Sequence, residues 1–397
     1  MNAHPDPGIA PGPASDASQA AGASGADEAG TPAGQTSGPY GALPAGLADL
    51  AGELLRDVRE IFSRIHVVSI PMAMRFRGVD TRTAMLLRGP AGWAEFSPFE
   101  EYPPPEAARW FAAALERAYV PGPAGTVRGQ VPVNATVPAC APEEVPGVLA
   151  RFPGCTTAKV KVAQSGVPLE ADIARVAAVR RELGQDGVIR VDANGGWSLA
   201  EAKRALRRLE EFGLQYAEQP CAAVEDLAAL RTEFAEAGIG VPIAADESIR
   251  RAEDPMRVAR LQAADYIVVK VQPLGGIAQA RRIVAQTGLP AVVSSALDTS
   301  IGIAAGVELA ALLPPGPDGE PLACGLGTVG LLRGDVAEPS LRPSGGMLPV
   351  TRPGADDALL ERYRADPGTA QAWLARAQAC WDLIRHSPGE DARVSAS

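Results

Sequence analysis

Eight short strand-like runs alternate with helical patterns along the middle of the chain, and this alternation restricts the possible folds more than any other feature. Segments in which apolar residues recur with helical spacing lie between most of the runs, most clearly at 169–183, 198–212, 224–237, 277–286 and 299–312. Eight strands alternating with helices over about 195 residues predict an α/β fold of the (β/α)8 barrel type. A doubly wound open sheet is the competing architecture, but the sequence has no Gly-rich phosphate loop after its first strand. The strand-like runs are 131–136, 156–162, 188–192, 215–218, 242–246, 264–270, 291–295 and 322–325.

The composition divides the chain around this predicted barrel, to which we assign residues 131–336. Residues 1–43 are rich in Ala, Gly, Pro, Ser and Thr, and we expect a disordered extension there because such a segment cannot bury enough apolar surface. We expect the same of the tail, 387–397. Residues 44–130 predict an α+β unit, and 337–386, helical over 359–384, should fold back onto it. Within that unit we expect helices at 47–64 and 105–118, strands at 65–70 and 83–88, and loops at 72–77 and 92–99.

Charge and cysteine content exclude several classes of protein. The formal net charge is −10 at pH 7, which argues against a surface for nucleic acid or for an anionic membrane. The five cysteines are scattered without CxxC spacing, so neither a disulfide framework nor a zinc ribbon is indicated. With no signal-peptide pattern and no run of about 18 apolar residues, we expect a cytoplasmic protein. The sequence leaves the oligomeric state open.

Three carboxylates follow consecutive predicted strands: Asp192, Glu218 and Asp246. In a barrel the carboxyl ends of the strands open on one face, where active sites are found. Each residue taken alone is better explained as a helix N-cap, but three in succession reverse that preference because clustered, partly buried carboxylates repel one another without a cation. Their hard oxygen ligands favour Mg²⁺, with Mn²⁺ as a substitute.

Lysine is rare in this chain, which has only Lys159, Lys161, Lys203 and Lys270 among its 37 basic residues. Where a charge suffices the chain uses Arg, so the remaining lysines are candidates for proton transfer, which guanidinium cannot perform. Lys159 and Lys161 are two apart in one predicted strand and therefore point to the same face, while Lys270 ends a strand across the ring. The helical Lys203 is expected on the surface.

The two sets together predict removal of a proton next to a carboxylate. A divalent cation bound to a substrate carboxylate stabilises the enediolate, and nearby cations lower a lysine pKa from about 10.4 towards neutrality. A histidine base or a Ser-His-Asp triad in the barrel is excluded, because the only histidines are His4, His66 and His386.

Three further residues are weaker candidates for substrate contacts. Asn194 follows the first carboxylate strand and could bind a ligand, although it also fits a turn. Ser294 and Ser295 end the seventh run and could bind a substrate carboxylate or cap the next helix equally well.

The ordered set Lys159-x-Lys161, Asp192-Ala-Asn194, Glu218-Gln-Pro220, Asp246-Glu-Ser248 and Lys270 resembles the enolase superfamily, in its muconate-lactonizing-enzyme-like branch. The resemblance covers about residues 58–385. It implies a modified barrel, with Mg²⁺ on the three carboxylates, under an α+β capping domain built from both chain ends. The segments 131–136, 158–163 and 293–302 look like o-succinylbenzoate synthases of actinobacterial type.

That resemblance implies dehydration of 2-succinyl-6-hydroxy-2,4-cyclohexadiene-1-carboxylate to o-succinylbenzoate, a step towards menaquinone. Lys161 would take the α-proton and then help the hydroxyl leave, Lys159 would assist electrostatically, and Lys270 would hold the ring from the other face. The loops 72–77 and 97–99 would close over the succinyl tail.

Rival functions remain within the same branch. In a dipeptide epimerase or N-acylamino-acid racemase, Lys161 and Lys270 would act as opposed bases, and a cycloisomerase is the other neighbour. A dipeptide's ammonium would favour an acidic pair near the eighth strand, but residues 324–328 contain no carboxylate. A non-catalytic ligand-binding barrel predicts loss of a lysine or carboxylate, and none is lost.

Overall fold

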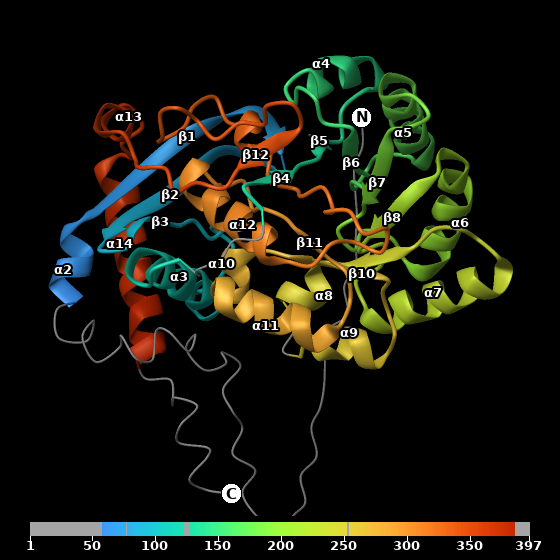
Figure 1. Cartoon of the computed structure of the whole chain (residues 1–397). Helices are drawn as coiled ribbons and strands as arrows, with labels where there is room; N and C mark the ends of the chain where they lie inside the picture. Colours follow the sequence, from blue (N-terminus) through green and yellow to red (C-terminus); the bar gives the residue numbers. More distant parts are fainter. Residues whose placement is uncertain (1–57, 77, 123–127, 252–253, 386–397) are drawn as a thin grey trace, which may run out of the picture. The chain divides into compact units, whose positions relative to one another are not determined.

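The computed structural model describes residues 58–76, 78–122, 128–251 and 254–385. The segments predicted to be disordered, 1–43 and 387–397, lie outside the described residues, as does most of the predicted helix 47–64. The described end of that helix is α2, Val58–Ser63. Most strands of the described residues belong to a small antiparallel sheet or to a larger parallel sheet (Figure 1).

The antiparallel sheet has the strand order β1, β2, β3. Its strands are Ile65–Phe76, Val79–Gly89 and Gly92–Phe96. Two loop predictions were therefore wrong: β1 continues through most of 72–77, and β3 occupies most of 92–99. The irregular register between Pro71 and Phe76 disturbs the alternation that identifies a strand, and the sequence does not reveal the pairing of β3 with β2.

The C-terminal segment packs against this sheet. The predicted helix 359–384 is divided into α13, Asp357–Arg362, and α14, Pro367–Arg385. The break arises because residues between them bond to β1: the Ser69 amide donates to the Tyr363 carbonyl at 2.8 Å, and the Ala365 amide to the Val67 carbonyl at 2.9 Å. A proline then starts the second helix, where its missing N–H costs nothing.

Helix α3, Pro104–Tyr119, confirms the helix predicted at 105–118 and lies beside α14. Phe96 of β3 meets both helices edge-on, with ring centroids 5.2 Å from Phe111 and 5.7 Å from Trp373. Edge-to-face aromatic pairs of this kind add roughly 0.5–1.5 kcal/mol each beyond the burial of their surfaces. Both ends of the described chain therefore share one apolar core.

The larger sheet contains seven parallel strands, paired in chain order from β5 to β11. Strands paired in this order require a crossover between each pair, which the intervening helices and loops supply. Every strand predicted between 156 and 295 is present: 188–192 has its predicted bounds, and the others differ by one or two residues at one or both ends. The seven strands are Ala135–Val137, Thr157–Lys161, Val188–Asp192, Leu214–Glu218, Ile243–Ala245, Tyr266–Val269 and Ala291–Val293.

Cys324 and Gly325 link the two edge strands of the parallel sheet. Gly325 bridges to Ser294 beyond β11, and Cys324 bridges to Val133 before β5. The Gly325 amide donates to the Val293 carbonyl at 2.8 Å, and the Asn134 amide to the Cys324 carbonyl at 2.9 Å. The predicted strand 322–325 is thus reduced to two bridging residues.

The predicted run 131–136 divides between two sheets. Its first part is β4, Gln130–Pro132, which pairs antiparallel with β12, Met347–Pro349. Its last part enters β5 of the parallel sheet. The residues of a predicted strand do not show that its pairing partner changes part-way along the strand.

Helices α5, α6 and α7 lie along the outer side of the strands that they connect (Figure 1). The predicted bounds of α5 and α7 are confirmed, and those of α6, α11 and α12 are off by one residue or by a final 3-10 turn. The helices of this part are α4 Val145–Leu149, α5 Leu169–Leu183, α6 Leu199–Leu209, α7 Val224–Ala237, α8 Glu247–Arg250, α9 Met256–Arg260, α10 Val271–Leu274, α11 Ile277–Thr287 and α12 Ser300–Leu312, with 3-10 turns η1 Pro142–Glu144, η2 Glu210–Phe212 and η3 Thr328–Leu331.

Glutamates from α3 and β3, which pack with the antiparallel sheet, cap two helices that follow strands of the parallel sheet. The Glu116 carboxylate accepts from the Ile277 and Ala278 amides at the start of α11, at 2.6 and 3.1 Å. The Glu95 carboxylate accepts from the Thr299 amide at 3.0 Å, where α12 begins. Negative charge is favourable at a helix N-terminus, so these contacts hold the two parts together.

A small apolar cluster fills the inner face of the parallel sheet: Tyr216, Ala244, Val268 and Val292. Each of these residues stands two positions before a predicted site residue. Because side chains two apart on a strand share a face, the cluster forms a floor beneath the predicted site.

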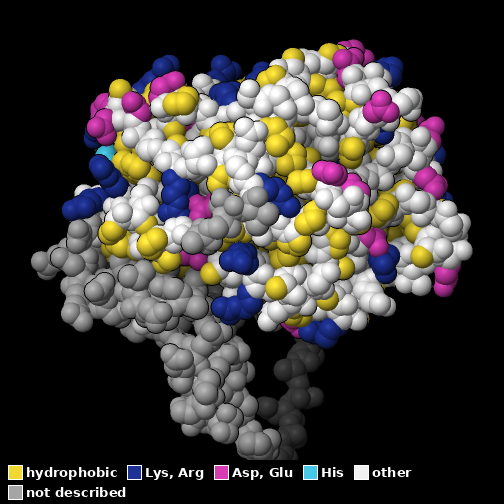
Figure 2. All heavy atoms as spheres, viewed as in Figure 1, with side chains coloured by type: hydrophobic (Ala, Val, Ile, Leu, Met, Phe, Trp, Pro, Cys, Tyr) yellow, Lys and Arg dark blue, Asp and Glu magenta, His cyan; other side chains and the backbone are white. Residues whose placement is uncertain are grey.

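Among the described residues, no helix combines the length and apolar character needed to cross a bilayer. Figure 2 shows basic and acidic side chains interspersed over the visible face, without a single continuous basic surface.

Candidate active site

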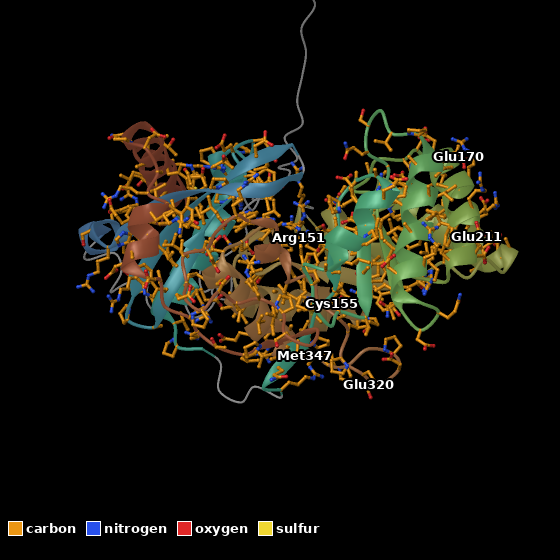
Figure 3. The ribbon with its side chains drawn as sticks, turned by 90° about the horizontal axis from the view of Figure 1, so that it is seen from above. Arg151, Cys155, Glu170, Glu211, Glu320 and Met347 are labelled. Carbon is orange, nitrogen blue, oxygen red and sulfur yellow. The ribbon has the colours of Figure 1, made fainter. Side chains whose placement is uncertain are left out.

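Lys161, Asp192 and Glu218 lie side by side at the carboxyl ends of β6, β7 and β8. The strand register pairs Lys161 with Asp192, and Asp192 with Glu218. Asp192 and Glu218 are each only 1% exposed. In contrast, acidic residues such as Glu170 and Glu211 lie on the outer helical layer, away from the strands (Figure 3). The predicted alternation of outer and inner residues therefore brings these three side chains together.

Asp246 and Lys270 complete the ring from the next two strands. Asp246 directly follows β9, and Lys270 directly follows β10. Their side chains form an ion pair, and Asp246 also accepts from the Arg250 guanidinium at 3.1 Å. All three lysines and all three carboxylates predicted for the site are thus on one end of the sheet.

Ammonium groups alternate with carboxylates across this ring. The Lys159 ammonium lies 3.0 Å from Glu218 and 3.3 Å from Asp192. The Lys161 ammonium lies 2.5 Å from Asp192. Such buried opposite charges compensate each other's desolvation, whereas removal of one partner would leave the other uncompensated.

Burial and neighbouring charges set the ionisation of these groups. Burial raises the pKa of Glu218 to about 7, the Asp192 charge adds to this effect, and Lys159 opposes it. Burial alone would raise the pKa of Asp246, but Lys270 and Arg250 outweigh it and lower that pKa. Burial alone would lower the pKa of Lys159, but Glu218 and Asp192 outweigh it and raise that pKa. A lysine held charged in this way suits an electrostatic role and not that of a base.

The ring opens into a small cavity of about 30 Å³, which is lined by the three lysines and Asp192. Besides predicted residues, the lining includes Thr136 of β5, Thr328 of η3 and Phe99 from the loop after β3. The Thr136 hydroxyl is buried and has no hydrogen-bond partner among the described residues. The rule that identified the lysines and carboxylates, a polar residue near the end of each strand, would also have identified Thr136.

The weaker candidates also reach this region. The Asn194 side-chain oxygen accepts from the Lys161 ammonium at 2.6 Å, so it orients that lysine. Ser294 and Ser295 line the cavity, and the Ser295 hydroxyl lies 2.6 Å from that of Thr328. Neither serine caps α12, because Thr299 is its N-cap residue. The surface position predicted for Lys203 agrees with its ion pair to the part-exposed Glu233.

The carboxylates fit a hard divalent cation by the chemistry of their donor atoms. They supply only oxygen, and the raised pKa of Glu218 means that a further cation would stabilise its charged form. Within the described ranges, no group of three or more acidic, histidine or cysteine side chains is spaced as a formed metal site. The Lys159 ammonium bridges Asp192 and Glu218, while Lys161 pairs with Asp192 and Lys270 with Asp246.

Two regions of the chain match known families. Residues 148–355 match the family described as enolase C-terminal domain-like, and residues 67–118 match the family described as enolase N-terminal domain-like. This chain belongs to the enolase superfamily. Members of the superfamily use Mg²⁺.

Superfamily relatives with curated names resemble the chain over most of their length. The o-succinylbenzoate synthase of Thermobifida fusca is 52% identical over 321 residues, covering 81% of this chain and 98% of that protein. The o-succinylbenzoate synthase of Mycolicibacterium smegmatis is 54% identical over 326 residues, covering 82% and 97%.

Solved structures of the superfamily share the fold. Muconate lactonizing enzyme from Pseudomonas fluorescens, complexed with muconolactone, superposes with a TM-score of 0.62 at 21% identity, over 76% of this chain and 98% of that chain. The L-Ala-D/L-Glu epimerase from Bacillus subtilis gives a TM-score of 0.60 at 23% identity, over 73% and 97%. At this identity the likeness concerns the fold alone.

Proposed function

We propose that this chain is an o-succinylbenzoate synthase, a lyase that dehydrates 2-succinyl-6-hydroxy-2,4-cyclohexadiene-1-carboxylate to o-succinylbenzoate in menaquinone biosynthesis. The observation that carries the proposal is the 52% identity to a synthase of which the chain covers 98%. Three lysines around one cavity support it, because the reaction needs a base, a proton donor and positive charge beside a carboxylate.

Asp192, Glu218 and Asp246 would hold a Mg²⁺ ion, with Mn²⁺ as a substitute. When bound, the ion supplies stabilisation for the negative charge that develops on the substrate carboxylate. The close approach of Asp192 and Glu218 in neighbouring strands supports this assignment. A bound cation would also stabilise the ionised form of these buried carboxylates.

Lys161 removes the α-proton at its side-chain nitrogen. The C–H electron pair becomes a ring double bond, the C–O bond breaks, and the protonated Lys161 returns the proton to the departing hydroxyl, so that water leaves and the ring becomes aromatic. Asn194 orients this nitrogen through its 2.6 Å contact. General acid–base groups placed in this way contribute about 10²- to 10⁴-fold.

The other lysines act without exchanging the α-proton. Lys159, kept charged by Glu218 and Asp192, adds positive charge next to the base. Lys270, 6% exposed and placed directly after a different strand, β10, faces the substrate from the opposite side, where an ammonium stabilises an aromatic ring. Thr136, Ser294 and Ser295 supply hydroxyls for the substrate's polar groups.

Around this site we further propose a closed barrel at 131–336, with Cys324 and Gly325 in place of the eighth strand. Residues 44–130 and 337–386 form the capping domain. The bridges from Gly325 to Ser294 and from Cys324 to Val133 support the closure. The bonds between β1 and residues 363–365 support a cap made from both ends. The cytoplasmic location expected from the sequence stays a prediction.

The test is a paired assay of purified protein with Mg²⁺. We expect aromatisation of the diene acid, followed by its ultraviolet change, and a fall of roughly 10²- to 10⁴-fold in Lys161→Ala. Lys203→Ala is the matched control, because this lysine pairs with Glu233 on the surface, and it should keep the full rate. Rapid α-proton exchange on N-acylamino acids with an untouched diene acid would instead identify a racemase.

A further inference from the structure

Arg82 on β2 is a charged residue buried between the antiparallel sheet and the candidate active site. Only 3% of it is exposed. Its guanidinium donates to the Leu297 carbonyl at 3.2 Å and to the Ala296 carbonyl at 3.1 Å, both in the loop after β11. It also donates to the Ser97 carbonyl in the loop after β3. One side chain thus joins two loops that are far apart in the sequence.

The first of these loops has a backbone that needs support. Leu297 has a φ of 64°, in the left-handed region that branched and bulky residues avoid. A residue held there costs of order 1–3 kcal/mol, and it stays there only where contacts with its surroundings offset that cost. Ala296 and Leu297 both line the cavity, so the contacts from Arg82 hold the shape of its wall.

The second loop carries Phe99, which also lines the cavity. The Arg82 guanidinium carbon lies 4.5 Å from the centre of the Phe99 ring. Trp110 meets the same ring edge-on, with centroids 6.3 Å apart. The ring is therefore held between a cation on its face and an aromatic neighbour.

A buried hydrogen-bond chain connects these loops to α10, the short helix that begins directly after Lys270. The Gln272 side chain accepts from the Ser97 amide at 3.2 Å and donates to Asp298 at 3.1 Å. Gln272 lies two residues beyond Lys270. Movement of either loop would thus disturb the segment that holds this lysine.

We propose that Arg82 is a positioning residue that fixes two segments of the cavity wall, Phe99 and Ala296–Leu297, in the geometry that orients the substrate. The expected change in kcat rests on the proposed function. The expected change in the positions of Leu297 and Phe99 rests on the geometry alone. A planar guanidinium can reach several carbonyls and stack on a ring at once, whereas the compact ammonium of lysine cannot.

Arg82→Lys and Arg82→Ala test this role, with Arg117→Ala as the matched control. Arg117 is another buried arginine between the two parts of the protein, but it pairs with Glu308, which keeps Arg352 as a second partner. We expect kcat of both Arg82 variants to fall about 10- to 100-fold, as is typical of a substrate displaced by about 1 Å. Added guanidinium ion at millimolar concentration should restore part of kcat in Arg82→Ala. Arg117→Ala should lower the melting temperature and leave kcat unchanged.

A crystal structure of Arg82→Lys supplies a readout that does not depend on the reaction. We expect Leu297 to leave the left-handed region and Phe99 to change its rotamer. Unchanged positions of both residues would overturn the inference, as would a wild-type kcat in Arg82→Lys. An equal loss of kcat in Arg117→Ala would show that general destabilisation is the cause. If wild type does not aromatise the diene acid, the proposed function fails, and the Leu297 and Phe99 positions still decide the role of Arg82.

Discussion

Replacing Glu95 with glutamine should change how the stability of this protein depends on pH. Glu95 on β3 is 3% exposed, and its carboxylate accepts from the Thr299 and Gly302 amides at the start of α12, each at 3.0 Å. Burial raises the pKa of Glu95 to about 7 from an ordinary 4.5, and the neighbouring Asp298 adds to this, while bonds from Ser97 and Thr299 oppose it. The Glu95→Gln variant removes the titration but keeps the size of the side chain.

The sign follows from the raised pKa. Between pH 4.5 and about 7 the folded protein binds more protons at Glu95 than the unfolded chain does, so stability is fully present below 4.5 and is lost as pH rises towards 7. At about 1.4 kcal/mol per pH unit, this interval corresponds to roughly 3 kcal/mol. The unfolding free energy of wild type minus that of Glu95→Gln should therefore fall by roughly 2–3 kcal/mol from pH 5 to pH 8.

Reversible urea unfolding of both proteins at pH 5 and pH 8 measures this difference, and the titrations of groups that do not interact with Glu95 cancel between them. Glu201→Gln is the control, because hydrogen bonds from Ser198 lower the pKa of that exposed carboxyl, so it cannot produce a decrease of the same sign. A difference that stays constant or grows with pH would refute the reasoning. It would mean that the helix amides stabilise the charged carboxylate more than burial destabilises it.

Three further predictions concern the site and its floor. Chelation with EDTA should abolish aromatisation and Mg²⁺ should restore it, with Mn²⁺ substituting; a full rate after chelation would contradict the assignment of the three carboxylates. Thr136→Val should raise KM about tenfold and leave the free energy of unfolding unchanged or slightly higher, because the buried hydroxyl has no partner among the described residues. An unchanged KM would exclude this hydroxyl as a substrate contact. Arg190→Met should lower the unfolding free energy by about 3 kcal/mol, since the buried guanidinium of Arg190, 1% exposed, donates to Gln215 at 2.7 Å and to the Ala323 carbonyl at 2.6 Å. An unchanged urea midpoint would contradict this prediction.

The predicted site followed from two short-range regularities. Side chains alternate along a strand, so Lys159 and Lys161 had to share a face. The spacing of the strands along the chain then placed Asp192, Glu218 and Asp246 at neighbouring strand ends. Both arguments use only periodicity and spacing along the chain, and the strand register, which sets Lys161 beside Asp192 and Asp192 beside Glu218, agrees with them.

Errors arose where strand pairing, and not local pattern, decides the structure. The segment 92–99 has a loop-like composition, yet Gly92–Phe96 is a strand because β2 pairs with it. The helix predicted over 359–384 is broken because residues 363–365 bond to β1, almost 300 residues earlier in the chain. Neither partner can be identified from the segment itself.

The sequence by itself therefore determined the class of fold, the order of the strands and the six charged residues at their ends, because periodicity and spacing are local properties. Only the tertiary structure decided which groups share the cavity with them. Arg82 bonds to Leu297 across a separation of 215 residues, and Glu95 caps a helix that begins 205 positions later. Such contacts depend on the path of the whole chain, and the energy of burying a charge is offset only where that path brings its partners together.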